Sequence, residues 1–297
     1  MTADSTLDGL KTVRELSGLS GARVLLVTRD DRHWFVRKVA HEPAGNERLQ
    51  RQMAKQILFG AATGTIVHTP RVIEHGLADS RFYFDMEFVR GTDGVSFLRR
   101  ASYADVVAFA DQLCDYLATV QRQAAAREHT GTLFESLYAK VVDVQRRTGA
   151  LGNATLATLF MALERLRDAG SGLAPTLCHG DLTLENLVID DKHRLWMLDL
   201  IDAPFEHYWQ DVAKLHQDLD GGWYLRHQPP VAQCVLEYLS RRLMTTATEL
   251  APRYAEIHAV MLACTFVRIL PYVRTDADAQ FVMHRVEHFA RLAQGES

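Results

Sequence analysis

The pattern of apolar and polar positions divides the chain into a strand-rich first third and a helical remainder. Residues 22–28 and 34–39 are apolar, β-branched runs separated by the turn residues Asp30 and Asp31, which predicts a β-hairpin. Residues 81–89 form another apolar run that ends near a glycine. We therefore expect a small antiparallel β-rich region here.

Helical periodicity interrupts these strands once and then dominates. Apolar residues recur every three to four positions over 46–59, which predicts a helix. Ser102 and Asp105 have the spacing of a capping box and predict where the next helix begins. Two short apolar pieces, 187–189 and 195–198, predict a hairpin within the helical part. Further helices are expected near residues 132–147, 153–169, 230–247, 251–270 and 276–293, and from residue 209 onward.

These elements predict an α+β fold with two lobes. The N-terminal lobe, residues 1–90, would hold the antiparallel strands and one helix. The C-terminal lobe, residues 91–297, would be larger and mainly helical. Gly91, which directly follows the last apolar run of the first part, is the natural boundary.

The segment CHGDLTLENLVIDDKHRLWMLDL, residues 178–200, carries the clearest chemistry in the chain. Asp181 and Asn186 are five residues apart on an expected loop, and Asp199 ends the second strand of the predicted hairpin. Phosphoryl transfer requires a carboxylate that orients or accepts the proton of the attacking hydroxyl. It also requires an amide and a carboxylate that bind Mg²⁺. A lone HGD tripeptide would be an ordinary turn, but that interpretation does not explain the ordered set.

HGDLxxxN followed by an apolar hairpin and Asp resembles the aminoglycoside phosphotransferase and choline kinase superfamily, small-molecule relatives of the protein kinases. The resemblance implies a kinase-like fold, with Asp181 as catalytic base or orienting carboxylate and His179 as a residue that holds the loop. Asn186 and Asp199 would bind Mg²⁺. Asp211, in QDVAKL, would brace the catalytic loop.

The first lobe offers a lysine suited to phosphate binding. Lys38 lies on the predicted strand WFVRKV, where its ammonium group could reach the α- and β-phosphates of ATP. Arg37 should point to the opposite face of that strand. The usual helical partner of such a lysine is a glutamate. Glu47 is the candidate, although it lies only nine residues further on, and Gln52 is the alternative.

Two backbone segments complete the expected nucleotide site. Gly18, Ser20 and Gly21 precede the first predicted hairpin, where glycines would let backbone N–H groups approach phosphates. By resemblance, the linker MEFVRG would hold the adenine, with backbone bonds at Glu87 and Val89 and with Met86 lining the pocket.

The sequence thus predicts an ATP- and Mg²⁺-dependent phosphotransferase with an alcohol group as acceptor, which acts on a small molecule. HGDLTLEN with QDxxKLxQDL resembles kinases found alongside surface-polysaccharide synthesis, and that resemblance favours a sugar or polyol. An acidic pocket would instead suit a cationic acceptor such as choline or an aminoglycoside. A nucleotide-binding pseudokinase and a protein kinase are the rival interpretations. Intact catalytic residues oppose the first, and the absence of an APE motif opposes the second. Polar acceptor-site candidates after Leu200 are Asp202, Glu206, His207, Asp218, Asp220, Trp223, Tyr224, Arg226, Arg268, Tyr272 and Arg274.

Bulk properties limit the partners and the compartment. The net charge of −4 gives no indication of a nucleic-acid partner, and no long uninterrupted apolar run predicts a membrane span. Four well-separated cysteines, without a CxxC pair, are expected to be reduced core residues of a cytoplasmic protein. His284 and His288 have i, i+4 spacing but no third metal ligand nearby, so they are interpreted as a solvated helix face. The sequence leaves the oligomeric state open.

Overall fold

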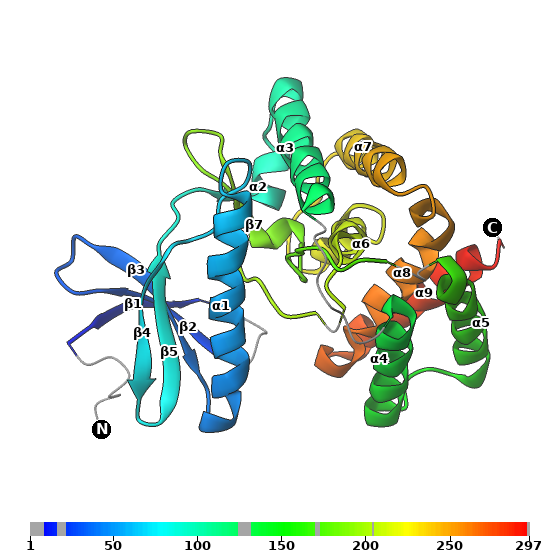
Figure 1. Ribbon diagram of the computed structural model, residues 1–297, viewed down its shortest axis with the longest axis horizontal. Helices are drawn as coiled ribbons and strands as arrows, with labels where there is room; N and C mark the ends of the chain where they lie inside the picture. The colour runs from blue at the N-terminus through cyan, green and yellow to red at the C-terminus, as the bar shows by residue number, and fades with distance from the viewer. Residues whose placement is uncertain (1–8, 17–21, 124–131, 170–172, 204, 296–297) are drawn as a thin grey trace. The chain divides into compact units, whose positions relative to one another are not determined.

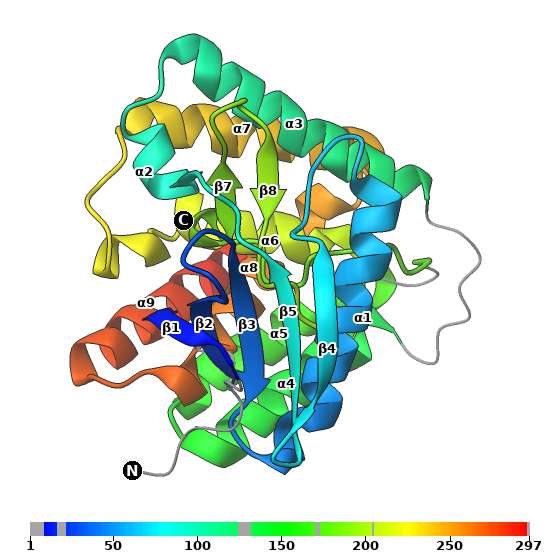
Figure 2. The same cartoon turned by 90° about the vertical axis from the view of Figure 1, so that its left-hand side faces the viewer.

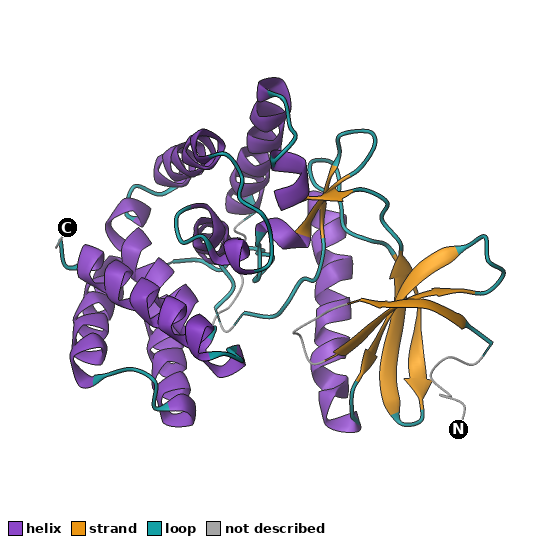
Figure 3. Ribbon diagram, turned by 180° about the vertical axis from the view of Figure 1, so that it is seen from behind, coloured by secondary structure: helices purple, strands orange, loops and turns teal. Residues whose placement is uncertain are grey.

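The computed structural model describes residues 9–16, 22–123, 132–169, 173–203 and 205–295. Contacts within the chain group it into two compact units (Figures 1 and 3). Unit 1 comprises Met1–Thr92 with Leu187–Asp202, and unit 2 comprises Asp93–Asn186 with Ala203–Ser297. The division in the first half of the chain lies next to Gly91. The hairpin after Asn186 groups with the strand-rich unit.

Unit 1 is built on a five-stranded antiparallel sheet with the order β1-β2-β3-β5-β4 (Figure 2). The expected β-rich region is thereby confirmed. β1 has little apolar character and is exposed along almost its whole length, which is why the hydrophobic pattern did not predict it. The strands are β1 (Lys11–Leu16), β2 (Ala22–Thr28), β3 (Trp34–Ala40), β4 (Val72–Ala78) and β5 (Arg81–Glu87).

Helix α1 (Asn46–Thr63) packs on one face of this sheet, after the short 3₁₀ turn η2 (Pro43–Gly45). Leu49 on the helix joins Leu26, Val36 and Phe84 from the strands in one buried core cluster. The helix runs four residues past the predicted end. Its C-terminal turn is buried at Phe59 and Thr63, so tertiary packing extends it.

The predicted hairpin forms within unit 1 from β7 (Leu187–Ile189) and β8 (Leu195–Met197). Together with β6 (Thr92–Asp93) it makes a small sheet of order β6-β7-β8. Gly91 lies against this hairpin so closely that an added Cβ would be 2.5 Å from the carbonyl oxygen of Ile189. Only glycine leaves room for that approach.

Unit 2 is mainly helical, as predicted. Ser102 and Asp105 form the expected capping box of α3, and Thr132 and Glu135 form a second one on α4. All twelve residues of α6 are buried, which makes it the central helix of the unit. The helices are α2 (Gly94–Leu98), α3 (Tyr103–Arg122), α4 (Leu133–Thr148), α5 (Asn153–Ala169), α6 (Tyr208–Leu219), α7 (Gln233–Leu250), α8 (Tyr254–Val267) and α9 (Asp276–Ala293), with 3₁₀ turns η3 (Leu184–Asn186), η4 (Trp223–Arg226) and η5 (Leu270–Tyr272).

The segment Tyr254–Tyr272 is, among the described residues, the one helical stretch long and apolar enough to cross a membrane, with mean hydropathy 1.3. However, 67% of that stretch is buried inside the protein, and α8 packs against α5, α6 and α9. It therefore has the burial of a core helix. Three of the four cysteines are also in the core. The exception is Cys234, which is exposed near the start of α7, so the expectation of four core cysteines was wrong.

Candidate active site

Lys38 is the buried basic residue of the central strand β3. Its side chain is 4% exposed, and its Nζ donates a 2.6 Å hydrogen bond to Oδ1 of Asp199. Both residues belong to unit 1. A buried ammonium requires a counter-charge, and Asp199 supplies it among the described residues. The sequence-predicted lysine and the carboxylate after β8 are therefore brought together.

The neighbouring Arg37 points to the other face of β3, as strand alternation predicts. Its guanidinium forms two hydrogen bonds, of 2.7 and 2.8 Å, with the carboxylate of Asp85 on β5, and it stacks over the ring of Tyr83. This buried pair is structural. Arg37 is therefore held on the face of β3 opposite to Lys38 and Asp199.

Asp199 has a left-handed backbone conformation, with φ of 59°. Aspartate tolerates this region better than most residues, at a cost of about 1–2 kcal/mol. The next residue, Leu200, is buried and anchors the turn. The left-handed turn therefore lets a polar carboxylate and an apolar anchor follow each other just beyond β8, which ends at Met197.

Helix α1 holds the segment that follows Asp199 through basic side chains. Nζ of Lys55, which is buried, donates a 2.7 Å bond to the carbonyl oxygen of Ile201, and Nε of Arg51 donates a 2.8 Å bond to Asp202. Asp202, an acceptor-site candidate from sequence, is thus paired with α1. Sequence reasoning missed Lys55, because its partner is 146 residues away and no local pattern indicates it.

Glu47 lies on the first turn of α1 and pairs with Arg51 at 2.7 Å. Its side chain is 83% exposed, and the structure does not bring it to Lys38. Gln52, the alternative, is buried on the same helix. Among the described residues, the partner of Lys38 is therefore the Asp199 carboxylate and not a helical glutamate.

The catalytic-loop candidates lie in unit 2. Oδ1 of Asp181 accepts a contact of 2.8 Å from Nζ of Lys214 on α6. Nδ2 of Asn186 donates to the main-chain oxygen of Asp181 at 2.8 Å, and the Asp181 N–H faces Nδ1 of buried His179 at 3.2 Å. The structure thus gathers Asp181, Asn186 and His179 around one turn. It adds Lys214, which the sequence analysis did not assign.

The charges around Asp181 keep its carboxyl group ionised. Burial by itself would raise its pKa, but the Lys214 ammonium and, further away, Arg268 and His179 outweigh burial, so the net direction of the pKa is downward. The carboxylate remains about one third exposed. An ionised, partly accessible carboxylate can accept a hydrogen bond from an incoming hydroxyl group.

Asp211 braces the catalytic loop through its backbone, as the resemblance implied. Its fully buried carboxylate accepts the N–H of His179 at 2.7 Å and that of Gly180 at 2.8 Å, and it also accepts the hydroxyl of Tyr116. Burial, with the nearby Asp211 charge, raises the pKa of Tyr116 well above its ordinary value, so the tyrosine stays a donor. Three donors converge on one carboxylate and fix the turn.

A second aspartate on α6, two turns after Asp211, supports the same loop. Oδ2 of Asp218 accepts the N–H of Leu184 at 2.8 Å, and burial raises the pKa of Asp218 to about 7. Asp211, Lys214 and Asp218 follow one another at spacings of three and four residues, which places them on one face of the helix. That spacing was the available sequence evidence for Lys214.

Several of the proposed acceptor-site residues have structural roles instead. His207 is the buried N-cap of α6, and burial lowers its pKa to about 3. The hydroxyl of buried Tyr224 accepts the N–H of Val231. Arg226 stacks on Trp223, with its guanidinium carbon 3.6 Å from the ring centroid, and pairs with an aspartate of α9.

The predicted nucleotide segments are only partly described. Gly18, Ser20 and Gly21 lie outside the described residues. Met86 is buried on β5, and the N–H of Glu87 donates to the carbonyl oxygen of Arg71 at 2.9 Å. Val89 is half-buried just beyond the strand.

Unit 1 also has a surface hollow of about 470 Å³. Its lining includes Phe35 and Asp85, which are on the Arg37 face of the sheet, so it is separate from the Lys38 side. The other lining residues are Arg29, Arg32, His33, Trp34, Ile73, Glu74, Phe88 and Arg90.

Comparisons with known proteins show the fold and the family of this chain. Similar structures include a fructosamine-3-kinase homologue from Thermobifida fusca (17% identity, 99% of both chains, TM-score 0.63) and choline kinase LicA from Streptococcus pneumoniae (16%, 98% and 96%, 0.58). The aminoglycoside phosphotransferase APH(3'')-Id from Streptomyces rimosus is also similar (18%, 98% and 94%, 0.52). At these identities the likeness establishes the kinase-like fold. No curated protein matches the sequence significantly. A family model does match residues 12–261, most of the chain, and this protein therefore belongs to the phosphotransferase enzyme family.

Proposed function

We propose that this protein transfers the terminal phosphoryl group of ATP to a hydroxyl group of a small molecule, most favourably a sugar or polyol. The observation that carries the proposal is the state of Asp181. Lys214 and its surroundings lower the pKa of this carboxylate, Asn186 fixes its main chain, and Asp211 fixes the turn before it. A kinase base needs that combination of ionisation and rigid placement.

In the proposed reaction Asp181 accepts a hydrogen bond from the acceptor hydroxyl and receives its proton. The hydroxyl oxygen forms a bond to the terminal phosphorus of ATP, the bond between that phosphorus and the bridging oxygen breaks, and ADP leaves. Lys214 keeps Asp181 ionised before the transfer. Lys38 would bind the α- and β-phosphates once the nucleotide competes for its ammonium group, which pairs with Asp199 here.

Asn186 and Asp199 would bind Mg²⁺, which when bound neutralises charge on the phosphate oxygens. Nδ2 of Asn186 is already used by the Asp181 main chain, which leaves the amide oxygen as its ligand atom. Asp199 offers a carboxylate oxygen, and such hard oxygen donors suit Mg²⁺. Similar structures carry ADP, or AMP-PNP with Ca²⁺, which supports nucleotide and divalent-metal use in this fold.

The remaining nucleotide contacts stay proposals. They are the backbone at Gly18, Ser20 and Gly21 and the linker positions Met86, Glu87 and Val89. We also expect a cytoplasmic protein, because ATP and reduced thiols are found there.

Two acceptor classes merit testing first. The names of similar structures include fructosamine kinase on one side, and choline kinase and a streptomycin complex on the other. The sugar or polyol remains the primary proposal, and the cationic acceptor is the alternative. A pseudokinase is disfavoured by the intact Lys38, Asp181, Asn186 and Asp199.

The test is ADP release from ATP and Mg²⁺ across sugars, polyols, amino sugars, choline, ethanolamine and aminoglycosides. Asp181→Asn should lower kcat by about 10²-fold or more while ATP still binds, because the base acts on the transition state. Asp143→Asn, the same chemical change at a surface pair with Arg146, is the matched control. Full turnover in Asp181→Asn, or nucleotide binding without transfer to any member of the panel, would contradict the proposal.

A further inference from the structure

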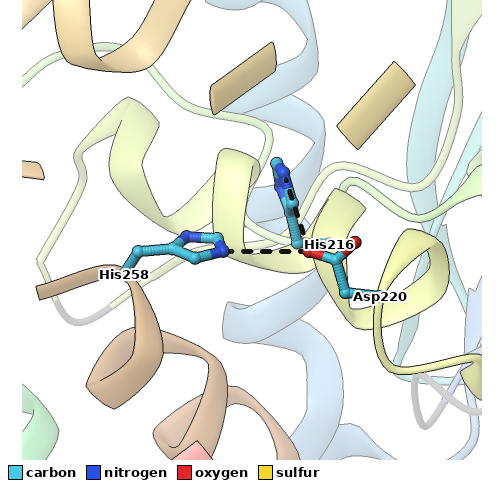
Figure 4. A group of neighbouring side chains, drawn as sticks. All are labelled: His216, Asp220 and His258. Carbon is cyan, nitrogen blue, oxygen red and sulfur yellow. Dashed lines mark ion pairs between the residues drawn. The ribbon is translucent and has the colours of Figure 1, made fainter. Parts of the chain in front are cut away.

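A separate group of potential metal ligands lies in unit 2, at the C-terminal end of α6 (Figure 4). His216 is on the last turn of that helix, Asp220 is its C-cap residue four positions later, and His258 is on α8. Oδ2 of Asp220 is 4.0 Å from Nε2 of His216 and 4.0 Å from Nε2 of His258. The possible ligand atoms all lie within 4.8 Å of one another.

The surroundings of His216 do not suit a neutral imidazole. Its Nδ1 is 2.8 Å from the carbonyl oxygen of Val212, and its Nε2 is 3.2 Å from the carbonyl oxygen of Ser240. The neutral ring, which is the form that binds a metal ion, carries one N–H and one lone pair. One nitrogen therefore faces a carbonyl oxygen without a proton between them.

The shorter contact assigns the proton to Nδ1, which donates to Val212. The lone pair of Nε2 then points toward the Ser240 carbonyl and the Asp220 carboxylate. Three electron-rich atoms face one another there, an arrangement that a cation between them would stabilise.

The second histidine, His258, also has an oxygen atom next to its Nδ1. Nδ1 of His258 is 3.0 Å from the hydroxyl of Tyr254, one turn earlier on α8, which leaves Nε2 directed toward Asp220. Metal-binding histidines commonly have the other ring nitrogen fixed by an oxygen, because this sets the tautomer and the ring orientation. Both histidines here have that arrangement.

Asp220 supplies the negative charge. Its side chain is 35% exposed, which provides a route for an ion and freedom to adjust.

We propose that His216, Asp220 and His258 form a site for a divalent transition-metal ion, with Zn²⁺ the best fit. Two imidazole nitrogens and a carboxylate oxygen are typical Zn²⁺ ligands, and the Ser240 carbonyl or a water could complete a tetrahedron. Ligand atoms in such a site are separated by about 3.3 Å. Asp220 must therefore move inward from its 4.0 Å separations, as its exposure permits.

The bound ion would connect α6 to α8. Because α6 also carries Asp211, Lys214 and Asp218, it would stiffen the helix that positions the catalytic loop. The site differs from the proposed Mg²⁺ ligands in having nitrogen donors, which Mg²⁺ rarely accepts.

The test uses the full chain after chelator treatment and dialysis. Calorimetric titration with Zn²⁺ should give one ion per chain, and Co²⁺ should produce the visible absorption of a low-symmetry nitrogen–oxygen site. Thermal unfolding should shift upward with Zn²⁺, because the ion binds the folded state. Asp220→Asn and His258→Ala should each lower the affinity for Zn²⁺ by at least about tenfold.

The matched control is His284→Ala with His288→Ala on α9, which removes two histidines at i, i+4 spacing where the sequence offers no third ligand. It should leave Zn²⁺ binding unchanged. His216→Ala is avoided as sole evidence because that side chain is fully buried. No stoichiometric Zn²⁺ binding, or equal binding in Asp220→Asn, would overturn the proposal. Neither result depends on phosphotransferase activity.

Discussion

Replacing Asp211 by asparagine should separate the bracing of the catalytic loop from its chemistry. The buried carboxylate accepts the N–H groups of His179 and Gly180 and the hydroxyl of Tyr116. An asparagine of the same shape keeps one acceptor oxygen and turns an N–H₂ group toward the other donors. At least one charge-assisted bond is lost, and one buried donor is left without an acceptor.

The magnitude follows from those two losses. A hydrogen bond to a charged group is worth about 1.5–3 kcal/mol, and an unsatisfied buried donor costs about 1–3 kcal/mol. We therefore expect Asp211→Asn to lower the free energy of unfolding by about 2.5–6 kcal/mol. That is a large share of the roughly 5–15 kcal/mol available to a folded protein. Tyr116→Phe removes only the hydroxyl donor and should cost at most about 3 kcal/mol.

The expected order of the free energies of unfolding can be measured by urea unfolding of the parent and of three variants, Asp211→Asn, Tyr116→Phe and Asp143→Asn. The last variant makes the same chemical change at an exposed pair with Arg146 and should be close to the parent. At a temperature where all four are folded, Asp211→Asn should also lose about 10²-fold in kcat, because the loop carrying Asp181 is displaced. A free energy of unfolding within about 0.5 kcal/mol of the parent would refute the bracing argument.

Three further changes test other parts of the structure. Lys214→Met removes the main cation beside Asp181, so burial should raise the pKa of that carboxyl group. The acid limb of the pH profile of kcat/KM should then move to higher pH, and an unmoved limb would contradict the role of Lys214. Asp218 has its pKa raised from 3.8 to about 7 by burial, so its contribution to stability is present below about pH 4 and is lost as pH rises through about 7. Asp218→Asn should flatten the pH dependence of unfolding in that window, and an unchanged slope would count against it. Gly91→Ala puts a Cβ 2.5 Å from the Ile189 carbonyl oxygen and should cost about 1–3 kcal/mol, measured by urea unfolding; a neutral result would show that the linker can shift.

The sequence predicted most of the elements because their determinants are local. The capping box at Ser102, the hairpin around 187–198 and the helical periodicity of 153–169 each depend on residues a few positions apart, and all three formed as expected. The exposed strand β1 was missed, because an edge strand without an apolar face leaves no periodic pattern. Cys234 was expected in the core because its surroundings in the sequence are apolar, although it is exposed at the start of α7.

In the candidate site, too, residues with local determinants could be predicted from the sequence, whereas contacts between distant residues could not. Asp181, Asn186 and Asp199 could be proposed because a fixed spacing joins them in the chain, and the Asp211 brace came with the same pattern. Lys214 could have been found, since it lies three residues after Asp211 on the same helical face. The contacts of Lys55 with Ile201 and of Lys38 with Asp199 span 146 and 161 residues, and only the folded chain shows them.

Helix α1 contacts the segment after Asp199 through basic side chains. If a helical glutamate were needed to hold Lys38, an early position such as Glu47 would have to turn inward. Instead it forms an exposed pair with Arg51, while Arg51 and Lys55 hold Asp202 and the Ile201 carbonyl. Basic residues of α1 thus position the segment after Asp199, and Asp199 in turn provides the charge for Lys38. The placement of α1 therefore affects Lys38 through the turn after β8.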